Sequence, residues 1–504
     1  MKFSTTIVAA AMALPMIHAA HHGKPKNYVF FLPDGYGPAS ETFARDYANW
    51  VDNATIVLPV DEMAIGYVRT KASDTLVTDS AAAATAYSCG IKTYNGAIGV
   101  DDDYLPCGTI LEAAKLNGYY TGLVVTSRIT HASPAGFATH IWDRDLEAEI
   151  ADQLVGYAHP LGRVVDVMMG GGKCFFLPQS DEDSCREDDV DLWSMAETDY
   201  NWTMTSAREA FDNLHNGESG DFPFAFIPTM GHMAYEADRD PQLEPSLTEM
   251  AITALNLLDR KSKEDDTNFF LFLEASRIDH AGHGHDPIGH LFDILEYNRA
   301  MLAVKQWIEE HDDTALLSAA DHECGGLTMG VPDYAWYPSV LANAERTSEY
   351  YAAIYDEIVA FNYTESVKES LIVDKVFGGF GIYNVTSEEI AGLSVAPSVA
   401  IYLGEVLSAR AGINWSTLGH TAVDITLFGY GTNTEKMVGN HENTEVGMFI
   451  TSELGLNLKN VTKKMMANES FVQMIQPPAD KMLLKKRFHV DHEHDVMHAG
   501  IHKH

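Results

Sequence analysis

The chain has 504 residues, of which 46% are hydrophobic, and its formal net charge is −38 at pH 7. Length and composition predict a large buried core, arranged as one large domain with insertions or as two domains. The acidic balance argues against non-specific binding to nucleic acid. It also means that a site for an anionic substrate needs local positive charge from metal ions or arginine.

The N-terminus has the order of residues found in a secretory signal peptide. Lys2 precedes an apolar run (7–17), and the small residues Ala19 and Ala20 follow. We predict cleavage of residues 1–20 and secretion; the alternative is an uncleaved signal anchor, with vacuolar or membrane-tethered localisation. No later segment offers about 18 unbroken apolar residues, and the C-terminus has no GPI-type tail, so no membrane anchor is expected after cleavage.

After a first apolar run (27–32) that ends at Asp34, a serine opens an alanine-rich helix. Ser80 follows Asp79 and precedes four alanines, which let a helix begin at once and pack closely against its neighbours. A serine at a helix N-terminus lies where backbone N–H groups and the helix dipole favour an anion, which suits a nucleophile that attacks phosphate. The alternative is a plain capped helix, with Asp79 or Ser80 as the cap.

Three further apolar runs have the length of buried strands, and helical stretches separate them. The runs are 120–126, 269–274 and 315–321, and the helical stretches include 108–117 and 245–258. This alternation predicts an α/β fold with a mostly parallel central β-sheet and helices on both faces. Three strands end in the carboxylates Asp34, Glu274 and Asp321. Ligands of such sheets gather beyond the carboxyl ends of the strands, so these side chains predict a site.

Histidines beside two of these carboxylates extend the predicted site. Asp279 and His283 are four residues apart and face the same way if the segment is helical. His322 follows Asp321 directly, and His420 precedes another apolar run. Mixed nitrogen and oxygen ligands suit catalytic zinc, whereas Asp34 and Glu274, with a hydroxyl such as that of Ser133, are hard ligands suited to magnesium. His280, His285 and His290 stay unassigned.

The chain outside this α/β pattern divides into two segments. Residues 326–419 are rich in aromatic residues and are broken by proline and glycine, so we predict an insertion above the site, with helices near 348–361 and 396–411, that acts as a dimer contact or a lid. The final segment (481–504) is rich in histidine, and we expect a disordered, weakly chelating tail. A catalytic domain of residues 21–480 remains between the signal peptide and the tail.

Glycosylation sites and cysteines agree with a secreted protein. Seven Asn-x-Ser/Thr sequons occur, at Asn53, Asn201, Asn362, Asn384, Asn414, Asn460 and Asn468. Cys174 and Cys185 flank a polar, turn-rich segment, which predicts a local disulfide. Cys89 follows the alanine-rich helix and is expected to be a buried small hydrophobe. The chain has five cysteines, so at least one is a free thiol or forms an intermolecular bond.

Taken together, these motifs resemble the alkaline phosphatase family. Five stretches carry the resemblance, occur in the family's order and span about residues 27–455: Asp79-Ser80 with the alanine run, 130–135, Arg277-Ile-Asp279-His-Ala-Gly-His283, Ala320-Asp321-His322 and Gly419-His420-Thr421. Longer stretches look most like the fungal branch. The resemblance implies a parallel α/β sheet with a crown-like insertion, a homodimer, and two zinc ions and one magnesium ion per chain.

The resemblance also implies a role for each matched residue. Ser80 is similar to the nucleophile that becomes phosphorylated, and Arg144 to the arginine that binds the phosphate. The implied ligands are Asp279, His283 and His420 for one zinc; Asp34, Asp321, His322 and Ser80 for the second; and Asp34, Ser133 and Glu274 for magnesium. Asp79 and His131 support these groups indirectly, with His131 acting on the magnesium shell through water.

The expected activity is hydrolysis of a broad range of small phosphate monoesters at alkaline pH. Two alternatives remain. One is a related metallohydrolase that prefers phosphodiesters or sulfate esters; the alanine-flanked serine and the spacing of Arg144 favour monoesters. The other is a secreted scavenger of metal or phosphate, suggested by the histidine-rich tail.

Overall fold

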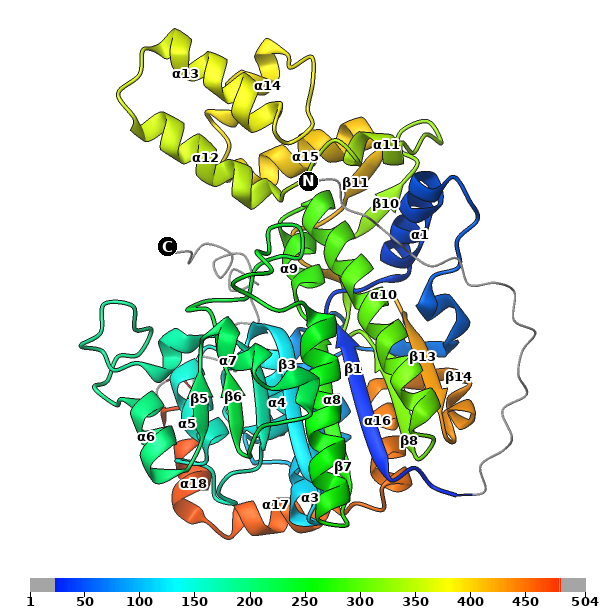
Figure 1. Ribbon diagram of the computed structural model, residues 1–504, viewed down its shortest axis with the longest axis vertical. Helices are drawn as coiled ribbons and strands as arrows, with labels where there is room; N and C mark the ends of the chain where they lie inside the picture. Colours follow the sequence, from blue (N-terminus) through cyan, green and yellow to red (C-terminus); the bar gives the residue numbers. More distant parts are fainter. Residues whose placement is uncertain (1–22, 480, 482–504) are drawn as a thin grey trace.

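A ten-stranded sheet forms the centre of the protein in a computed structural model that describes residues 23–479 and 481 (Figure 1). Across the sheet the strands are β14 (Gly439–Glu442), β2 (Ala64–Arg69), β13 (Ile425–Gly431), β8 (Thr314–Ala319), β1 (Asn27–Pro33), β7 (Phe269–Ala275), β3 (Tyr120–Arg128), β4 (Val167–Gly171), β6 (Phe224–Phe226) and β5 (Thr203–Thr205). Only β13 runs antiparallel to its neighbours within this sheet. The α/β class and the mostly parallel sheet are confirmed.

The four apolar runs seen in the sequence are the four central strands β8, β1, β7 and β3. Every residue of β1, β7 and β8 is buried, because helices cover both faces of the sheet. Consecutive apolar residues therefore face apolar surfaces on both sides. Their carboxyl ends lie next to one another at one edge of the sheet.

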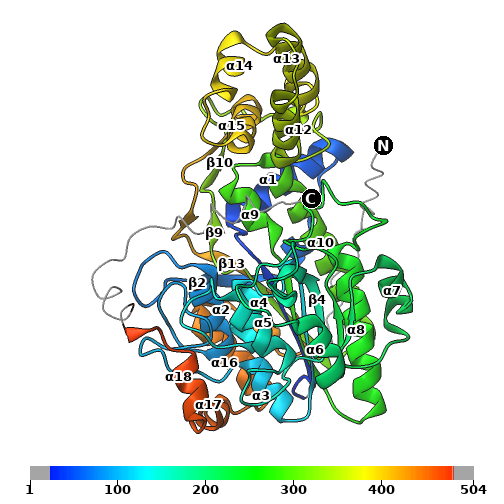
Figure 2. The ribbon, with the colours of Figure 1, turned by 90° about the vertical axis from the view of Figure 1, so that its left-hand side faces the viewer.

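Helices pack on both faces of the sheet, and those on one face are longer than those on the other. α8 (Leu247–Glu264) and α10 (Pro287–Glu310) lie on one face, and α2 (Ser80–Cys89), α3 (Ile110–Leu116), α4 (Ala132–Ala138) and α16 (Asn443–Glu453) lie on the other (Figure 2). α2 packs against α4 and α16, so the helix that begins at Ser80 is held between two others. All ten residues of α2 are buried.

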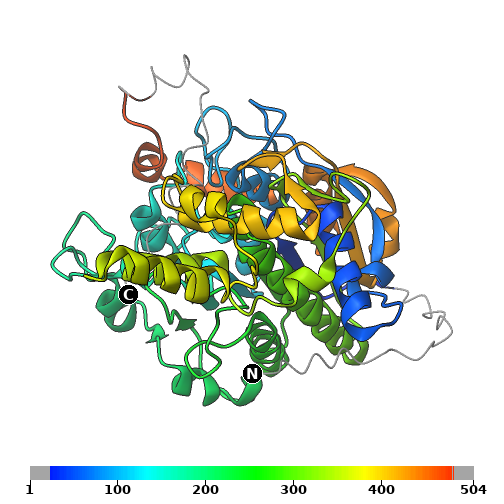
Figure 3. The same cartoon turned by 90° about the horizontal axis from the view of Figure 1, so that it is seen from above.

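A group of helices stands apart from the sheet, at the end of the molecule where the strands deliver their carboxyl ends (Figure 1). It contains α11 (Pro338–Leu341), α12 (Ser348–Ala360), α13 (Glu365–Leu371), α14 (Ser387–Leu393) and α15 (Val399–Ala411), which confirms the two helices expected here. α12 and α15 run side by side in the view from above (Figure 3). At the base, β10 (Leu327–Met329) pairs antiparallel with β11 (Ile413–Trp415), so the segment leaves and returns at one place.

The cysteines correct one expectation. Cys174 and Cys185 form the expected disulfide, but Cys89 is bonded to Cys107 and is not a free small hydrophobe. The Cys89 side chain is buried, as predicted, because α2 ends against the segment that carries its partner. Cys324 is the remaining thiol.

All seven sequon asparagines are exposed. Among the helices of the described residues, none is long and apolar enough to cross a membrane. The predicted signal peptide and all of the histidine-rich tail except Lys481 lie outside the described residues.

Candidate metal centre

Three neighbouring strands deliver carboxylates to one edge of the sheet. Asp34 directly follows β1, and Glu274 is the last residue but one of β7. Asp321 lies just beyond the end of β8. β1 lies between the other two, with Leu32 opposite Glu274, so the three side chains converge. All three are fully buried, and burial together with the neighbouring Asp321 raises the pKa of Asp34 well above its ordinary value. Carboxyl groups buried this close together stay charged only with a cation between them; without one, a proton must neutralise some of them.

Asp279, His283 and His420 form the first cluster. Asp279 and His283 lie one turn apart on α9 (Arg277–His283), and His420 begins β12 (His420–Thr421). Nε2 of His283 lies 3.3 Å from Asp279 Oδ2 and 3.1 Å from Nε2 of His420, which lies 3.5 Å from Asp279 Oδ1. Ligands bound at about 2.0–2.1 Å to a tetrahedral ion are separated by about 3.3 Å, so these distances are close to those expected between ligands of one ion.

Backbone carbonyls orient both imidazoles of this cluster. Nδ1 of His283 bonds to the carbonyl of Leu418, and Nδ1 of His420 bonds to the carbonyl of Thr78 at 2.9 Å. With Nδ1 protonated, each Nε2 presents a lone pair to the cluster, which is the usual outer-shell arrangement of metal-binding histidines.

A second cluster contains the serine. Nε2 of His322 lies 3.0 Å from Asp321 Oδ2, 3.8 Å from Asp34 Oδ1 and 3.1 Å from Ser80 Oγ. The His322 and His420 rings stack at a centroid distance of 3.4 Å, so the two clusters adjoin. One hydroxyl, two carboxylates and one imidazole are therefore gathered beside the first cluster.

Local structure fixes the position of Ser80. The Asp79 carboxylate accepts a hydrogen bond from the Ala82 N–H at 2.9 Å, so Asp79 caps α2 and Ser80 is its first residue. Small side chains let α2 approach α4 closely, since a Cβ on Gly136 would lie 2.9 Å from the Ala84 Cβ. The Tyr87 hydroxyl donates to the carbonyl of Ala320 at 2.7 Å and ties the helix to the end of β8.

Ser133 and Glu274 lie behind Asp34. Ser133 is in the first turn of α4 and is fully buried. Burial raises the pKa of Glu274 to about 8. Within residues 23–479, both oxygens of Asp34, Oε1 of Glu274 and Oγ of Ser133 have no hydrogen-bond partner. Hard oxygen donors left without partners in a buried place fit a divalent ion such as magnesium.

Arg144 is held beside Asp79, the residue that precedes the serine. Its Nη1 lies 3.2 Å from Asp79 Oδ2, and its Nη2 lies 3.2 Å from Nε2 of His131. Its backbone N–H donates to the carbonyl of Gly96 at 2.9 Å. The guanidinium is therefore held beside the residue that caps the serine's helix, where its planar fork can bind two oxygens of an anion.

The structure brings together every residue that the sequence predicted for the site, and it adds one. Cys324 joins Asp279, His283 and His420 in a group whose ligand atoms all lie within 4.8 Å of one another. Sequence reasoning missed it because the pattern considered contained no thiolates; the available signal was its position two residues after His322. The unassigned His290 is structural, because it bonds to Ser40 and to the carbonyl of Ile278.

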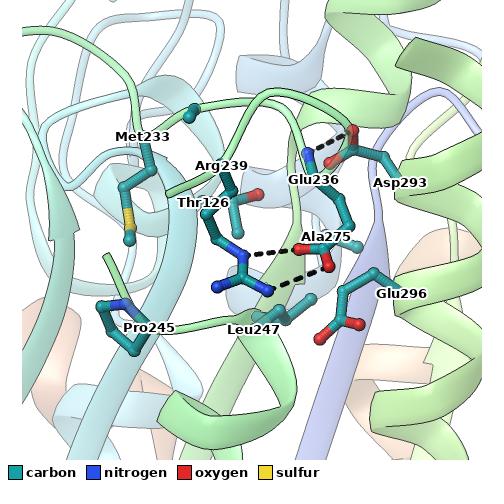
Figure 4. A pocket seen from close by; sticks show the side chains of 10 residues that line it. Thr126, Met233, Glu236, Arg239, Pro245, Leu247, Ala275, Asp293 and Glu296 are labelled. Atoms are coloured by element: carbon teal, nitrogen blue, oxygen red, sulfur yellow. Dashed lines mark hydrogen bonds and ion pairs between the residues drawn. The ribbon is translucent and has the colours of Figure 1, made fainter. Parts of the chain in front are cut away.

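A small acidic cavity lies under the same end of the sheet (Figure 4). Its volume is about 10 Å³, roughly the space of one water molecule. Arg239 bonds to both oxygens of Glu236, and Asp293 accepts the Glu236 N–H. The cavity has no room for a phosphate ester, and none of the predicted ligands lines it.

Carboxylate, imidazole and hydroxyl groups at the carboxyl edge of this sheet fit the class of hydrolases that use divalent metal ions. The comparisons with known proteins agree. The chain belongs to the alkaline phosphatase family, whose profile matches residues 25–456, and it is a phosphomonoester hydrolase.

Two fungal proteins and one solved bacterial structure illustrate the similarity. The repressible alkaline phosphatase of Saccharomyces cerevisiae is 42% identical over 494 residues, covering 90% of this chain and 86% of that protein. The alkaline phosphatase of Schizosaccharomyces pombe is 41% identical over 454 residues, covering 88% and 84%. The cold-active alkaline phosphatase from the psychrophile Shewanella sp. superposes with a TM-score of 0.72 at 27% identity, covering 85% of this chain and 99% of that one.

Proposed function

We propose that the protein hydrolyses a broad range of phosphate monoesters through a phosphoserine at Ser80, at a site for two zinc ions and one magnesium ion. The observation that carries the proposal is the position of Ser80 Oγ, 3.1 Å from Nε2 of His322 at the start of a buried helix. The buried carboxylates around it are of the kind that hold divalent ions.

Each ion has a proposed ligand set. The residues are Asp279, His283 and His420 for one zinc; Asp34, Asp321, His322 and Ser80 for the other; and Asp34, Ser133 and Glu274 for magnesium. The unpartnered oxygens of Asp34, Glu274, Asp279 and Asp321 within the described residues support these sets. When bound, such ions lower the pKa of a coordinated hydroxyl and neutralise charge on the leaving oxygen.

The chain's own residues then perform two displacements. Arg144 binds two phosphoryl oxygens with its fork and orients the phosphorus towards Ser80. A bond forms between Ser80 Oγ and phosphorus as the bond to the alcohol oxygen breaks, and the alcohol leaves with a proton. Water then replaces Ser80 Oγ, so inorganic phosphate is released and the serine regains its proton. Asp79 holds Arg144, and His131 lies beside it.

Replacement of the serine tests the mechanism. Ser80→Ala should lower turnover of p-nitrophenyl phosphate by at least about a thousandfold, because the nucleophile is removed. Ser88→Ala is the matched control, since Ser88 is a buried serine at the other end of the same helix. Near-native turnover by Ser80→Ala would disprove the assignment. An acid-quenched reaction should carry phosphate on the peptide that contains Ser80.

Metal content and substrate class test the rest of the proposal. Elemental analysis should find two zinc ions and one magnesium ion per chain, and chelation should abolish activity. Monoesters should react much faster than bis(p-nitrophenyl) phosphate; the reverse order would favour a phosphodiesterase. Uptake of phosphate in stoichiometric amount without turnover would favour a scavenger.

We further propose that the mature protein begins after residue 20, is secreted and glycosylated, and forms a homodimer. The two disulfides and the exposure of all seven sequon asparagines support secretion and glycosylation. The helices α12–α15, which project beyond the sheet, are the proposed dimer contact or lid (Figure 1). N-terminal sequencing of the mature protein tests the cleavage after residue 20, glycosidase treatment tests the glycosylation, and light scattering tests the homodimer.

A further inference from the structure

Cys324 lies among Asp279, His283 and His420, the predicted ligands of the first cluster. The elements that carry these ligands, α9 and β12, also hold Cys324 in place. Cys324 ends β9 (Glu323–Cys324), which pairs antiparallel with β12, so Cys324 is the cross-strand partner of His420. The residue is fully buried. Its sulfur and the ligand atoms of Asp279, His283 and His420 all lie within 4.8 Å of one another.

The helix that carries the other two ligands also packs on this sulfur. Gly282 lies next to His283 on α9, and a Cβ there would lie 3.0 Å from both the Cβ and the Sγ of Cys324. Any side chain larger than hydrogen at Gly282 would therefore press against the thiol. The sulfur is thus held against α9 on one side and β12 on the other, and these elements carry all three predicted ligands.

An independent observation points to a ligand at this place. Asp279 is only 3% exposed, and within residues 23–479 its Oδ1 has no hydrogen-bond partner. Nε2 of His283 lies 3.1 Å from Nε2 of His420 and 3.3 Å from Asp279 Oδ2, and Nε2 of His420 lies 3.5 Å from Asp279 Oδ1, distances that suit ligands of one ion. The thiol donates a long hydrogen bond, at 3.8 Å, to the carbonyl of Gly419.

We propose that Cys324, as a thiolate, is a fourth protein ligand of the metal ion that Asp279, His283 and His420 hold. The proposal rests on the metal site of the proposed function. When the metal binds, the S–H bond breaks, its proton is released to the solvent, and one sulfur–metal bond forms. Catalytic zinc sites accept a fifth ligand, so a position for water or a phosphoryl oxygen remains. A sulfur donor makes the site softer, which favours zinc over magnesium and manganese there.

Cobalt substitution tests the sulfur directly. The other four cysteines are disulfide-bonded, so Cys324 is the single thiol that can give a sulfur-to-cobalt charge-transfer band in the near ultraviolet. We expect the band in the wild-type Co²⁺ protein and its loss in Cys324→Ser and Cys324→Ala. The double variant Cys174→Ser with Cys185→Ser is the matched control and should keep the band.

A second measurement needs no variant. X-ray absorption at the zinc edge of the wild-type holoenzyme should show a sulfur neighbour at about 2.3 Å besides nitrogen and oxygen at about 2.0–2.1 Å. The variants give a further readout, because loss of the sulfur in Cys324→Ala should lower the affinity for zinc, measured by competition with a chelator, by roughly 10–100-fold.

The outcomes separate this inference from the proposed function. A protein that binds zinc and hydrolyses monoesters but shows neither the charge-transfer band nor the sulfur neighbour overturns the role of Cys324 alone. A protein that binds no zinc overturns both. A band that survives in Cys324→Ser and Cys324→Ala would also contradict the assignment.

Discussion

Asp79 connects the serine's helix to Arg144, the proposed phosphate-binding arginine, and its replacement gives a quantitative test of this arrangement. Its Oδ1 accepts the Ala82 N–H at 2.9 Å, whereas its Oδ2 accepts the Gly96 N–H at 2.8 Å and pairs with Arg144 at 3.2 Å. Asp79→Ala removes all three interactions. Asp79→Asn keeps an oxygen for Ala82 but turns an NH₂ group towards the two donors.

The magnitudes follow from the lost partners. A helix N-cap contributes about 1 kcal/mol. A backbone N–H left without an acceptor costs about 1–3 kcal/mol, and the half-exposed Gly96 lies at the low end of that range. Asp79→Asn should therefore lower the free energy of unfolding by about 1 kcal/mol and Asp79→Ala by about 2 kcal/mol. The difference between the two variants measures the cap.

Urea unfolding followed by tryptophan fluorescence, with the midpoint shift converted by the wild-type slope, gives both values. Asp103→Asn is the control, because it removes the same charge from an exposed position; it should change stability by less than about 0.5 kcal/mol. Equal losses in Asp79→Asn and Asp79→Ala would refute the capping role. Unchanged stability in both would refute the whole account of Asp79.

Three other predictions concern protons and the fold. Burial opposes the charged form of His140, but the Glu112 carboxylate at 2.8 Å outweighs it and raises the pKa of His140. The stabilisation by this ion pair is complete below about pH 6.5 and is lost as the pH rises through the pKa of His140 in the folded protein. The difference in unfolding midpoint between wild type and Glu112→Gln should therefore become smaller from about pH 6 to about pH 9. A difference that grows over this range would contradict the prediction. Burial raises the pKa of Glu274 to about 8, so loading the metal-free protein with divalent ions at about pH 7 should release protons into a weakly buffered indicator, and no release would count against Glu274 as a ligand. The Cys89–Cys107 bond closes a separation of 18 residues, so replacing both by alanine should lower the free energy of unfolding by about 3 kcal/mol in urea, and no change would contradict the pairing.

The central strands and the site's carboxylates could be predicted because one physical cause produces both signals. A parallel strand covered on both faces must be apolar throughout, and β1 and β7 show this as unbroken runs. The run stops where the chain leaves the sheet, so the polar residue there, such as Asp34, is visible in the sequence.

Edge strands and long-range pairings lack such a signal. β5 and β6 have three residues each, too few for any periodicity to appear. The partner of Cys89 depends on the path of an irregular loop that returns to α2, and sequence spacing does not encode that path. Cys324 lies two residues after His322 in the sequence, but its contact with His420 depends on the pairing of β9 with β12.

The acidic surface of the protein and the proposed metal centre are related through the charge of the substrate. A protein with a net charge of −38 repels phosphate esters at long range. Inside the site, Asp34, Glu274, Asp279 and Asp321 are buried, and Arg144 already shares its charge with a carboxylate. Without ions, acidic groups therefore outnumber the single arginine where an anionic substrate would bind. The three divalent ions of the proposed site would carry more positive charge than the four carboxylates carry negative charge, so they would reverse the sign of the local field. On this proposal, the buried acidic groups are what hold the ions that attract phosphate.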